Sequence, residues 1–226
     1  PMTDDADAAT PVQRIGFFGP LGTFTQQALI GIESANGAEH IPYRTVPDVL
    51  DAVQSGEVDA GFVPIENSIE GMVNFTQDAL AFDYDLLITH ESVIDIEHCL
   101  LVKPGCSLDE VTEVLSIPVA TAQCHRYLRE RLPDADVVAA NSTADAALRV
   151  SESERTDVAA LAPRIAAEVY SLEIAAADIA DHEGNQTRFV MVARSGVPAP
   201  TGHDRTALVV YQRADEPGSL ISILQE

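Results

Sequence analysis

Short apolar runs typical of β-strands alternate with helix-like segments along most of this 226-residue chain. The pattern predicts strands at 14–19, around 40–43, and at 60–65, 117–120, 136–140 and 158–163. It predicts helices at 23–33, 46–56, 107–115, 122–132, 142–154 and 164–172, the first with Thr23 as its N-cap. Residues 85–102 are predicted to form two strands that meet near the middle of this segment. Such an alternation is the pattern of an α/β fold.

The last apolar segment, 178–194, is predicted to return to the sheet built by the first third of the chain. The expected main domain spans 12–194, with one lobe at about 12–95 plus 178–194 and the other at about 96–177. In folds of this kind ligands bind between the lobes, at the carboxyl ends of strands.

The segment after this domain has a different composition. Residues 195–204 are rich in Gly and Pro and are interpreted as a linker. A strand is predicted at 205–212 and the start of a helix at 219–226. Residues 205–226 are too few to bury a core of their own, so they are interpreted as the start of a regulatory domain.

The charge of the chain excludes one class of partner. The net charge is -23, and Lys103 is the single lysine among 13 basic residues. Binding to nucleic acid needs a basic stripe, so nucleic acid is not expected as a partner. Such acidity resembles that of proteins from organisms that accumulate molar salt, where the Debye length falls to about 3 Å. An acidic mesophilic protein is the alternative.

Other features bear on location and cofactors. No apolar run is long enough for a membrane span, and residues 1–11 are acidic rather than signal-like, so we expect a cytosolic protein. The three cysteines cannot all pair, and the six histidines do not fall at metal-ligand spacing. We therefore expect neither a disulfide framework nor a metal site, and no cofactor.

Four polar clusters follow predicted strands or open predicted helices, at 19–24, 64–71, 116–128 and 183–190. Each has a plain structural alternative as a turn, a helix cap or a solvated surface. Together they supply hydroxyls, amides, one carboxylate at a strand end and an arginine, with neither a Gly-x-Ser-x-Gly elbow nor a catalytic-cysteine signature. This set of groups suits the binding of a small anion better than covalent catalysis.

The chain resembles the prephenate dehydratase family over about residues 14–194, and its tail resembles the start of an ACT domain. The motifs that carry the resemblance are GPLGTFTQQAL, VPIENSIEGMV, AQCHRYL, STADAA, ALAPRIAAEVYSL and NQTRFVMV. The resemblance implies a two-lobed catalytic domain like that of periplasmic binding proteins. It also implies conversion of prephenate to phenylpyruvate, CO2 and water, homodimers or homotetramers, and L-phenylalanine as an allosteric effector.

Carried over by position, the resemblance assigns Thr187, Glu66 and Asn67 as catalytic. Thr187 would donate a hydrogen bond to the departing hydroxyl, with water or Glu66 as a proton relay. The residues assigned to substrate binding are Thr23, Ser68, Ser116, Gln123, Arg188 and Phe189. Ser116 and Gln123 would reach over from the second lobe.

Two of the assigned side chains have alternative roles. Arg188 either pairs with a substrate carboxylate or braces its loop, and bracing is favoured. Phe189 is expected to pack in the protein rather than stack on the substrate ring.

Two positions depart from the family pattern and bear on the contacts of the second lobe. The family often has Ser-His-Pro-Gln where residues 116–119 are Ser-Ile-Pro-Val, and its acidic residue before Ser-Thr is Asn141 here. An arogenate dehydratase is the alternative enzyme. A two-lobed module that binds a small anion without turning it over is the alternative outside enzymes.

The halophilic interpretation predicts that the melting temperature rises steeply between low and molar KCl, because salt screens the repulsion among the acidic side chains. Thermal unfolding followed by circular dichroism over a KCl series measures this dependence. A melting temperature that stays flat over that series would contradict the interpretation.

Overall fold

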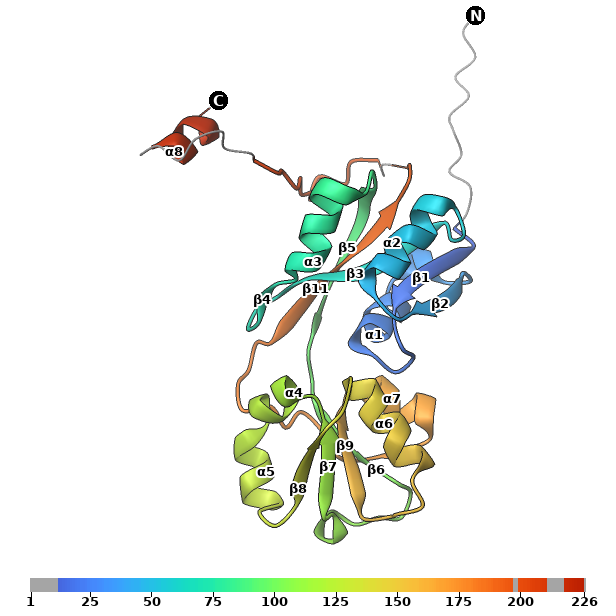
Figure 1. Ribbon diagram of the computed structural model, residues 1–226, viewed down its shortest axis with the longest axis vertical. Helices are drawn as coiled ribbons and strands as arrows, with labels where there is room; N and C mark the ends of the chain where they lie inside the picture. The colour runs from blue at the N-terminus through green and yellow to red at the C-terminus, as the bar shows by residue number, and fades with distance from the viewer. Residues whose placement is uncertain (1–11, 197–198, 211–217, 226) are drawn as a thin grey trace, which may run out of the picture.

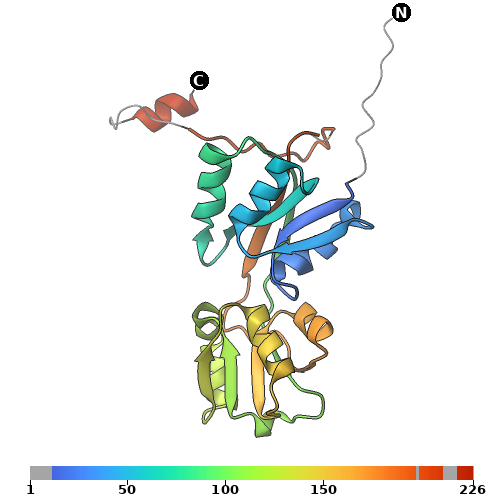
Figure 2. The same ribbon diagram turned by 45° about the vertical axis from the view of Figure 1, so that its right-hand side comes forward.

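The computed structural model describes residues 12–196, 199–210 and 218–225. Residues 14–193 form two α/β lobes stacked along the long axis of the molecule, and the C-terminal segment extends away from them (Figure 1). Each lobe has a sheet of its own. The chain passes from lobe 1 to lobe 2 once and returns once, and both connections are seen between the lobes in the turned view (Figure 2).

Lobe 1 contains a sheet of strand order β2-β1-β3-β11-β5, with β4 paired to β3. The strands are β1 (Arg14–Phe18), β2 (Glu39–Tyr43), β3 (Ala60–Asn67), β4 (Gly71–Met72), β5 (Leu87–Asp95) and β11 (Gln186–Ala193). The helices are α1 (Phe24–Ile30), the 3-10 turn η1 (Glu33–Ala35), α2 (Val46–Ser55), α3 (Asn74–Asp78) and the π-helical turn η2 (Ala79–Asp83). The strand β11 is antiparallel to both β3 and β5, so the last strand of the lobe lies inside its sheet.

Helices cover both faces of the lobe 1 sheet. Phe62 packs with residues of α1 on one face, whereas its neighbour Val63 packs with α2 on the other. This follows from the alternation of side chains along a strand. The helix α2 has strong local signals: Thr45 and Asp48 form a capping box, and Gly56 ends the helix with a φ of 81°.

Lobe 2 contains a sheet of strand order β10-β6-β9-β7-β8. The strands are β6 (Cys99–Val102), β7 (Glu113–Ser116), β8 (Asp136–Ala139), β9 (Val158–Ala162) and β10 (Glu173–Ala176). The helices are the 3-10 turn η3 (Leu108–Glu110), α4 (Pro118–Gln123), α5 (His125–Arg131), α6 (Thr143–Glu152) and α7 (Arg164–Tyr170).

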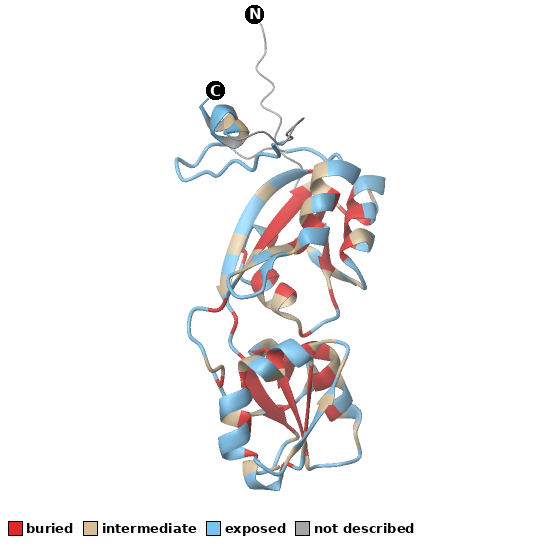
Figure 3. Ribbon diagram, turned by 60° about the vertical axis from the view of Figure 1, so that its left-hand side comes forward, coloured by how far each residue is buried: buried red, intermediate tan, exposed pale blue. Residues whose placement is uncertain are grey.

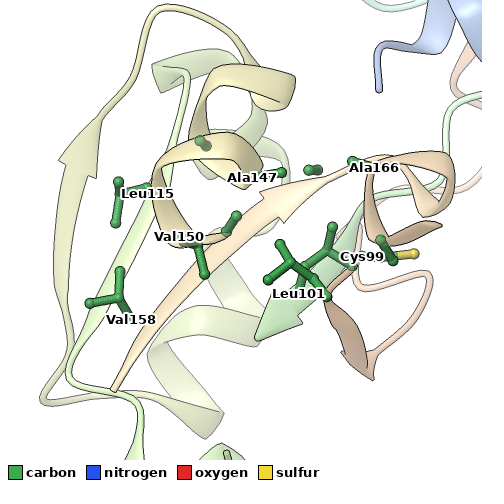
Figure 4. Close-up of a cluster of buried hydrophobic side chains, with 12 residues drawn as sticks. Cys99, Leu101, Leu115, Ala147, Val150, Val158 and Ala166 are labelled. Atoms are coloured by element: carbon green, nitrogen blue, oxygen red, sulfur yellow. The ribbon is translucent and has the colours of Figure 1, made fainter. Parts of the chain in front are cut away.

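The core of lobe 2 lies on both faces of its sheet. Cys99 and Leu101 pack with α6 and α7 on one face, as the close-up shows (Figure 4). Leu100 and Leu161 pack with α4 and α5 on the other. Buried residues follow the strands and the inner helix faces, while the outer helix faces are exposed (Figure 3).

Most predicted elements agree with the structure, and the main error falls at the start of lobe 2. The helix predicted at 107–115 is wrong: the structure has a single 3-10 turn there, followed by β7. The strand predicted at 117–120 is also wrong, because Pro118 begins α4. Val114 and Leu115 face opposite cores, so this central strand is apolar on both faces and its pattern imitates a helix.

The tail is partly described. Residues 205–210, within the strand predicted at 205–212, have no regular secondary structure, and residues 211–212 lie outside the described part. A strand needs a partner for its ladder of hydrogen bonds, and the tail meets none among the residues described. The predicted helix at the end is present as α8 (Ser219–Leu224). Among the residues described, no helix is long and apolar enough to cross a bilayer.

Gly61 allows α2 to pack closely on β3. A Cβ atom at this position would lie 2.8 Å from methyl groups of both Val49 and Val53. We predict that Gly61→Ala lowers the free energy of unfolding by about 1–3 kcal/mol, because the core must shift to admit it. Denaturant unfolding measures the change.

Gly31→Ala is the matched control. Gly31 has a φ of -72°, and its added Cβ would come no closer than 3.4 Å to a neighbouring atom. Its free energy of unfolding should stay within about 0.5 kcal/mol of the parent. Equal losses in the two variants would contradict the packing argument.

Candidate active site

The candidate site begins where two strands of lobe 1 lie side by side at the lobe junction. Thr187, near the start of β11, is paired with Asn67, the last residue of β3. The sequence predicted that the strand would end at residue 65, within the polar cluster at 64–71. In the structure Glu66 and Asn67 continue β3, because β4 folds back on them as a short hairpin. This extension brings Asn67 to Thr187.

The orientation of the Asn67 side chain is fixed by backbone groups. Its Oδ1 accepts hydrogen bonds from the backbone N–H groups of Ile69, at 2.9 Å, and Glu70, at 2.8 Å. Its Nδ2 must therefore be the donor to Thr187 Oγ1 and to Asn185 Oδ1, each at 2.8 Å. The amide cannot be turned over without placing its NH2 group against two N–H donors.

This arrangement determines what the Thr187 hydroxyl can do. A hydroxyl carries one hydrogen and two acceptor lone pairs. Because Asn67 donates to Thr187 Oγ1, the hydroxyl hydrogen of Thr187 is left to donate elsewhere. The side chain is half-buried, so its hydrogen can point toward a ligand at the junction.

Asn185 extends the cluster toward lobe 2. It is 5% exposed, and since its Oδ1 accepts from Asn67, its Nδ2 is the donor to Gln123 Oε1 at 3.1 Å. Gln123 lies at the end of α4 in lobe 2, and its Nε2 donates to Glu70 Oε1 of lobe 1 at 3.2 Å. The predicted reach of Gln123 to lobe 1 is therefore present in the structure.

His98 also contacts Gln123. Its Nε2 lies 3.0 Å from Gln123 Oε1, and its ring meets the ring of Phe24 of lobe 1 edge-on at 5.6 Å. The side chain is 3% exposed, and burial lowers the pKa of its imidazole, an effect that the Gln123 hydrogen bond opposes in part.

Ser68 fastens the loop before β11. Its hydroxyl donates to the carbonyl of Gly184 at 3.0 Å and accepts from the backbone N–H of Gln186 at 2.9 Å. The backbone N–H of Ser68 also donates to the carbonyl of Gln186 at 2.8 Å. Ser68 thus holds the residues that flank Asn185 next to the end of β3.

Arg188 and Glu66 lie on the other face of the sheet. They are paired across β11 and β3, one position along from Thr187 and Asn67, and successive side chains of a strand point to opposite faces. Arg188 Nη1 donates to Glu91 at 2.6 Å, and its Nε lies 3.2 Å from a Glu66 carboxylate oxygen. Arg188 therefore links β11 to both neighbouring strands, which agrees with the bracing role favoured from the sequence. Glu66 does not lie beside the Thr187 hydroxyl, contrary to its predicted role as a proton relay.

Thr23 lies in the loop that opens α1. Its hydroxyl accepts from the backbone N–H of Gln26 at 3.3 Å, which confirms it as the N-cap, and donates to the carbonyl of Pro20 at 3.1 Å. The same loop meets lobe 2, because the Tyr170 hydroxyl donates to the carbonyl of Leu21 at 2.7 Å. Thr23 is thus close to the junction but is not hydrogen-bonded to the Asn67–Thr187 pair.

Two predicted substrate contacts lie inside the protein instead. Ser116 is fully buried, and its hydroxyl donates to the carbonyl of Leu161 at 2.7 Å across the lobe 2 sheet. It does not reach toward lobe 1, because its hydroxyl hydrogen is bound to this carbonyl inside lobe 2. Phe189 stacks on Phe62 at 5.5 Å in the core of lobe 1, in line with the expectation that it packs.

Sequence reasoning left three members of the cluster without a role: Glu70, His98 and Asn185. Asn185 stood in the 183–190 cluster, and Glu70 in the 64–71 cluster. His98 carried little signal, since a single histidine beside an apolar strand is more often a core residue. Among the residues described, no group of three His, Cys, Asp or Glu side chains is placed to bind a metal ion.

Comparison with known proteins gives a consistent set of matches. The family model for prephenate dehydratase matches residues 15–196. The prephenate dehydratase of Amycolatopsis methanolica is 42% identical over 217 residues, which cover 95% of this chain and 69% of the relative. The prephenate dehydratase of Arthrobacter aurescens, solved in complex with L-Phe, is 41% identical with a TM-score of 0.85. That match covers 94% of this chain and 71% of that one.

A solved structure with a different described activity is also similar. The quorum-quenching acylase GqqA is 31% identical, with a TM-score of 0.73, and the match covers 83% of this chain and 66% of that one.

Proposed function

Since this chain belongs to the prephenate dehydratase family, we infer that it catalyses the decarboxylating dehydration of prephenate to phenylpyruvate. We propose that the reaction takes place at the Asn67–Thr187 pair. The observation that carries this proposal is the fixed Asn67 amide, which leaves the Thr187 hydroxyl hydrogen free to donate.

The reaction itself explains why so few groups are needed. Prephenate carries a carboxylate on a quaternary ring carbon and a hydroxyl at the opposite ring position. When the bond to the carboxylate breaks, its electron pair enters the ring and the C–O bond to the hydroxyl breaks, giving CO2, an aromatic ring and hydroxide, which a proton converts to water. Aromatisation supplies the driving force, so the protein has to orient the substrate and assist the leaving hydroxyl.

Thr187 is placed to assist the leaving hydroxyl. As negative charge develops on the departing oxygen, the Thr187 O–H donates a hydrogen bond that is stronger in the transition state than in the bound substrate. Asn67 keeps the threonine oxygen in its acceptor role throughout, and Asn185 holds Asn67. The proton that completes the water molecule comes from the solvent at the half-exposed junction.

The carboxylates of prephenate need donors, and lobe 2 contributes one. Gln123 Nε2 already donates to the Glu70 carboxylate, so it can donate to a substrate carboxylate in the same direction. Ser68 and Thr23 remain proposed contacts from lobe 1, and each would have to turn its hydroxyl hydrogen away from a backbone carbonyl, of Gly184 and of Pro20, to donate to the substrate. Salt screening reduces the repulsion between this dianion and a protein of net charge -23.

Several wider properties are proposals of the same kind. The Arthrobacter structure holds L-Phe, which supports L-phenylalanine as an effector of the full-length protein. We further propose that residues 205–226 begin an ACT domain, that the protein is a cytosolic homodimer or homotetramer, and that it is adapted to high salt. Its acidic composition supports the last of these.

The decisive test removes the Thr187 hydroxyl. In molar KCl with prephenate as substrate, followed by phenylpyruvate absorbance, we predict that Thr187→Ala lowers kcat by two orders of magnitude or more. Thr187→Ser, the matched control, keeps the hydroxyl and should retain most of the rate. Both variants should keep the parent's circular dichroism spectrum. Wild-type turnover by a folded Thr187→Ala would refute the role of Thr187.

The same assay separates the alternatives. Faster turnover of arogenate than of prephenate would identify an arogenate dehydratase. Prephenate binding without turnover would identify an anion-binding module. Acylase activity without dehydratase activity would place the chain with GqqA in function, although its identity to the Amycolatopsis and Arthrobacter dehydratases is higher.

A further inference from the structure

His98 occupies the connection that carries the chain from lobe 1 to lobe 2. It lies between the end of β5 and the start of β6, and its carbonyl accepts from the backbone N–H of Ile179 at 3.0 Å. The N–H of Ile96 donates to the carbonyl of Asn185 at 2.8 Å, so the outgoing and returning connections run side by side here.

The hydrogen bond of His98 has one possible direction. The amide oxygen of Gln123 can only accept, so His98 Nε2 must carry the hydrogen and the ring is the neutral Nε2–H tautomer. Its Nδ1 is buried and has no hydrogen-bond partner among the described residues. Protonation at Nδ1 would bury both a charge and an unpaired donor, which is costly, so the geometry favours the neutral ring.

The second consequence concerns Gln123. Its Oε1 accepts from both His98 and Asn185, at 3.0 and 3.1 Å. Turning the amide over would set its NH2 group against two donors. With both bonds in place, Nε2 is directed toward Glu70 of lobe 1, where the proposed substrate carboxylate would accept from it.

We propose that His98 is a positioning residue that locks the Gln123 amide with its NH2 group toward the substrate carboxylate. The proposal rests on the function proposed above and adds a residue to it. Without His98, Asn185 would hold the Gln123 oxygen alone, and the amide would occupy the productive orientation for less of the time. A plain alternative is that His98 only fills the space beside Phe24.

A double-mutant cycle in the prephenate assay distinguishes positioning from filling. We predict that His98→Leu lowers kcat/KM roughly three- to ten-fold, the effect of one neutral hydrogen bond. In a Gln123→Met background the same substitution should change kcat/KM less than two-fold, because the amide it positions is gone. His98→Gln, which can restore a donor, should recover part of the loss. An equal effect in both backgrounds would overturn the proposal.

Thr76→Val is the matched control for loss of a buried polar atom. Thr76 is fully buried on α3, and its hydroxyl has no hydrogen-bond partner among the residues described. This substitution should leave kcat/KM unchanged in either background. A loss as large as that of His98→Leu would show that the assay reports general packing.

A measurement on the unmodified protein keeps the proposal open to refutation if His98→Leu does not fold. Nitrogen-15 NMR of the imidazole rings at neutral pH should show His98 as the neutral Nε2–H tautomer. An Nδ1–H tautomer or an imidazolium would overturn the proposal. The NMR measurement does not depend on turnover. Failure of the proposed function would be seen as a wild-type protein that is inactive on prephenate, whereas failure of the His98 assignment would be seen in the NMR spectrum.

Discussion

The rest of the site depends on one pair of hydrogen bonds from the backbone to a side chain. Two consecutive N–H groups, of Ile69 and Glu70, hold the oxygen of Asn67, and this fixes the direction of every bond that follows. Asn67 must donate to Thr187 and to Asn185, and Asn185 must then donate onward. Each of these amides can make its hydrogen bonds in one orientation only, so the network holds the side chains of Asn67, Asn185 and Gln123 in place.

The network contains residues of both lobes. Lobe 1 alone presents the threonine, but Gln123 of lobe 2 supplies the amide that donates to Glu70 and that we propose binds a substrate carboxylate. The two lobes meet through Asn185 and His98, both on the connecting segments, and through the Tyr170 contact to the loop before α1. A change in lobe orientation would therefore alter the contacts of Gln123 before it altered the Asn67–Thr187 pair, which lies within lobe 1.

The alternation of strands and helices was sufficient for the α/β architecture, whereas Asn67 and Thr187 were assigned to one site through the family resemblance, because each polar cluster alone also fits a turn or a helix cap. The sequence was insufficient where one pattern fits two structures. Residues 107–115 have the pattern of a helix, yet Glu113–Ser116 form the strand β7, which is buried on both faces, and this error also misplaced Ser116. The resemblance placed Glu66 beside Thr187, but in the structure the Glu66 side chain lies on the opposite face of the sheet. The face is decided by the register of β3 and β11, which strand pairing sets and composition does not. No sequence motif marks His98, because its neighbours come together only where the two connections between the lobes run side by side.

The central claim is that Asn67 keeps the Thr187 oxygen an acceptor and its hydrogen free. Asn67→Asp tests it directly, since a carboxylate of nearly the same shape can still accept from the backbone but cannot donate to Thr187. Steady-state kinetics with prephenate should show kcat reduced about 100-fold or more, with the fold retained, because the hydroxyl now donates to the carboxylate. Asn74→Asp, an exposed position at the start of α3, adds the same charge and should turn over like the parent. A folded Asn67→Asp with the kcat of the parent would contradict the account.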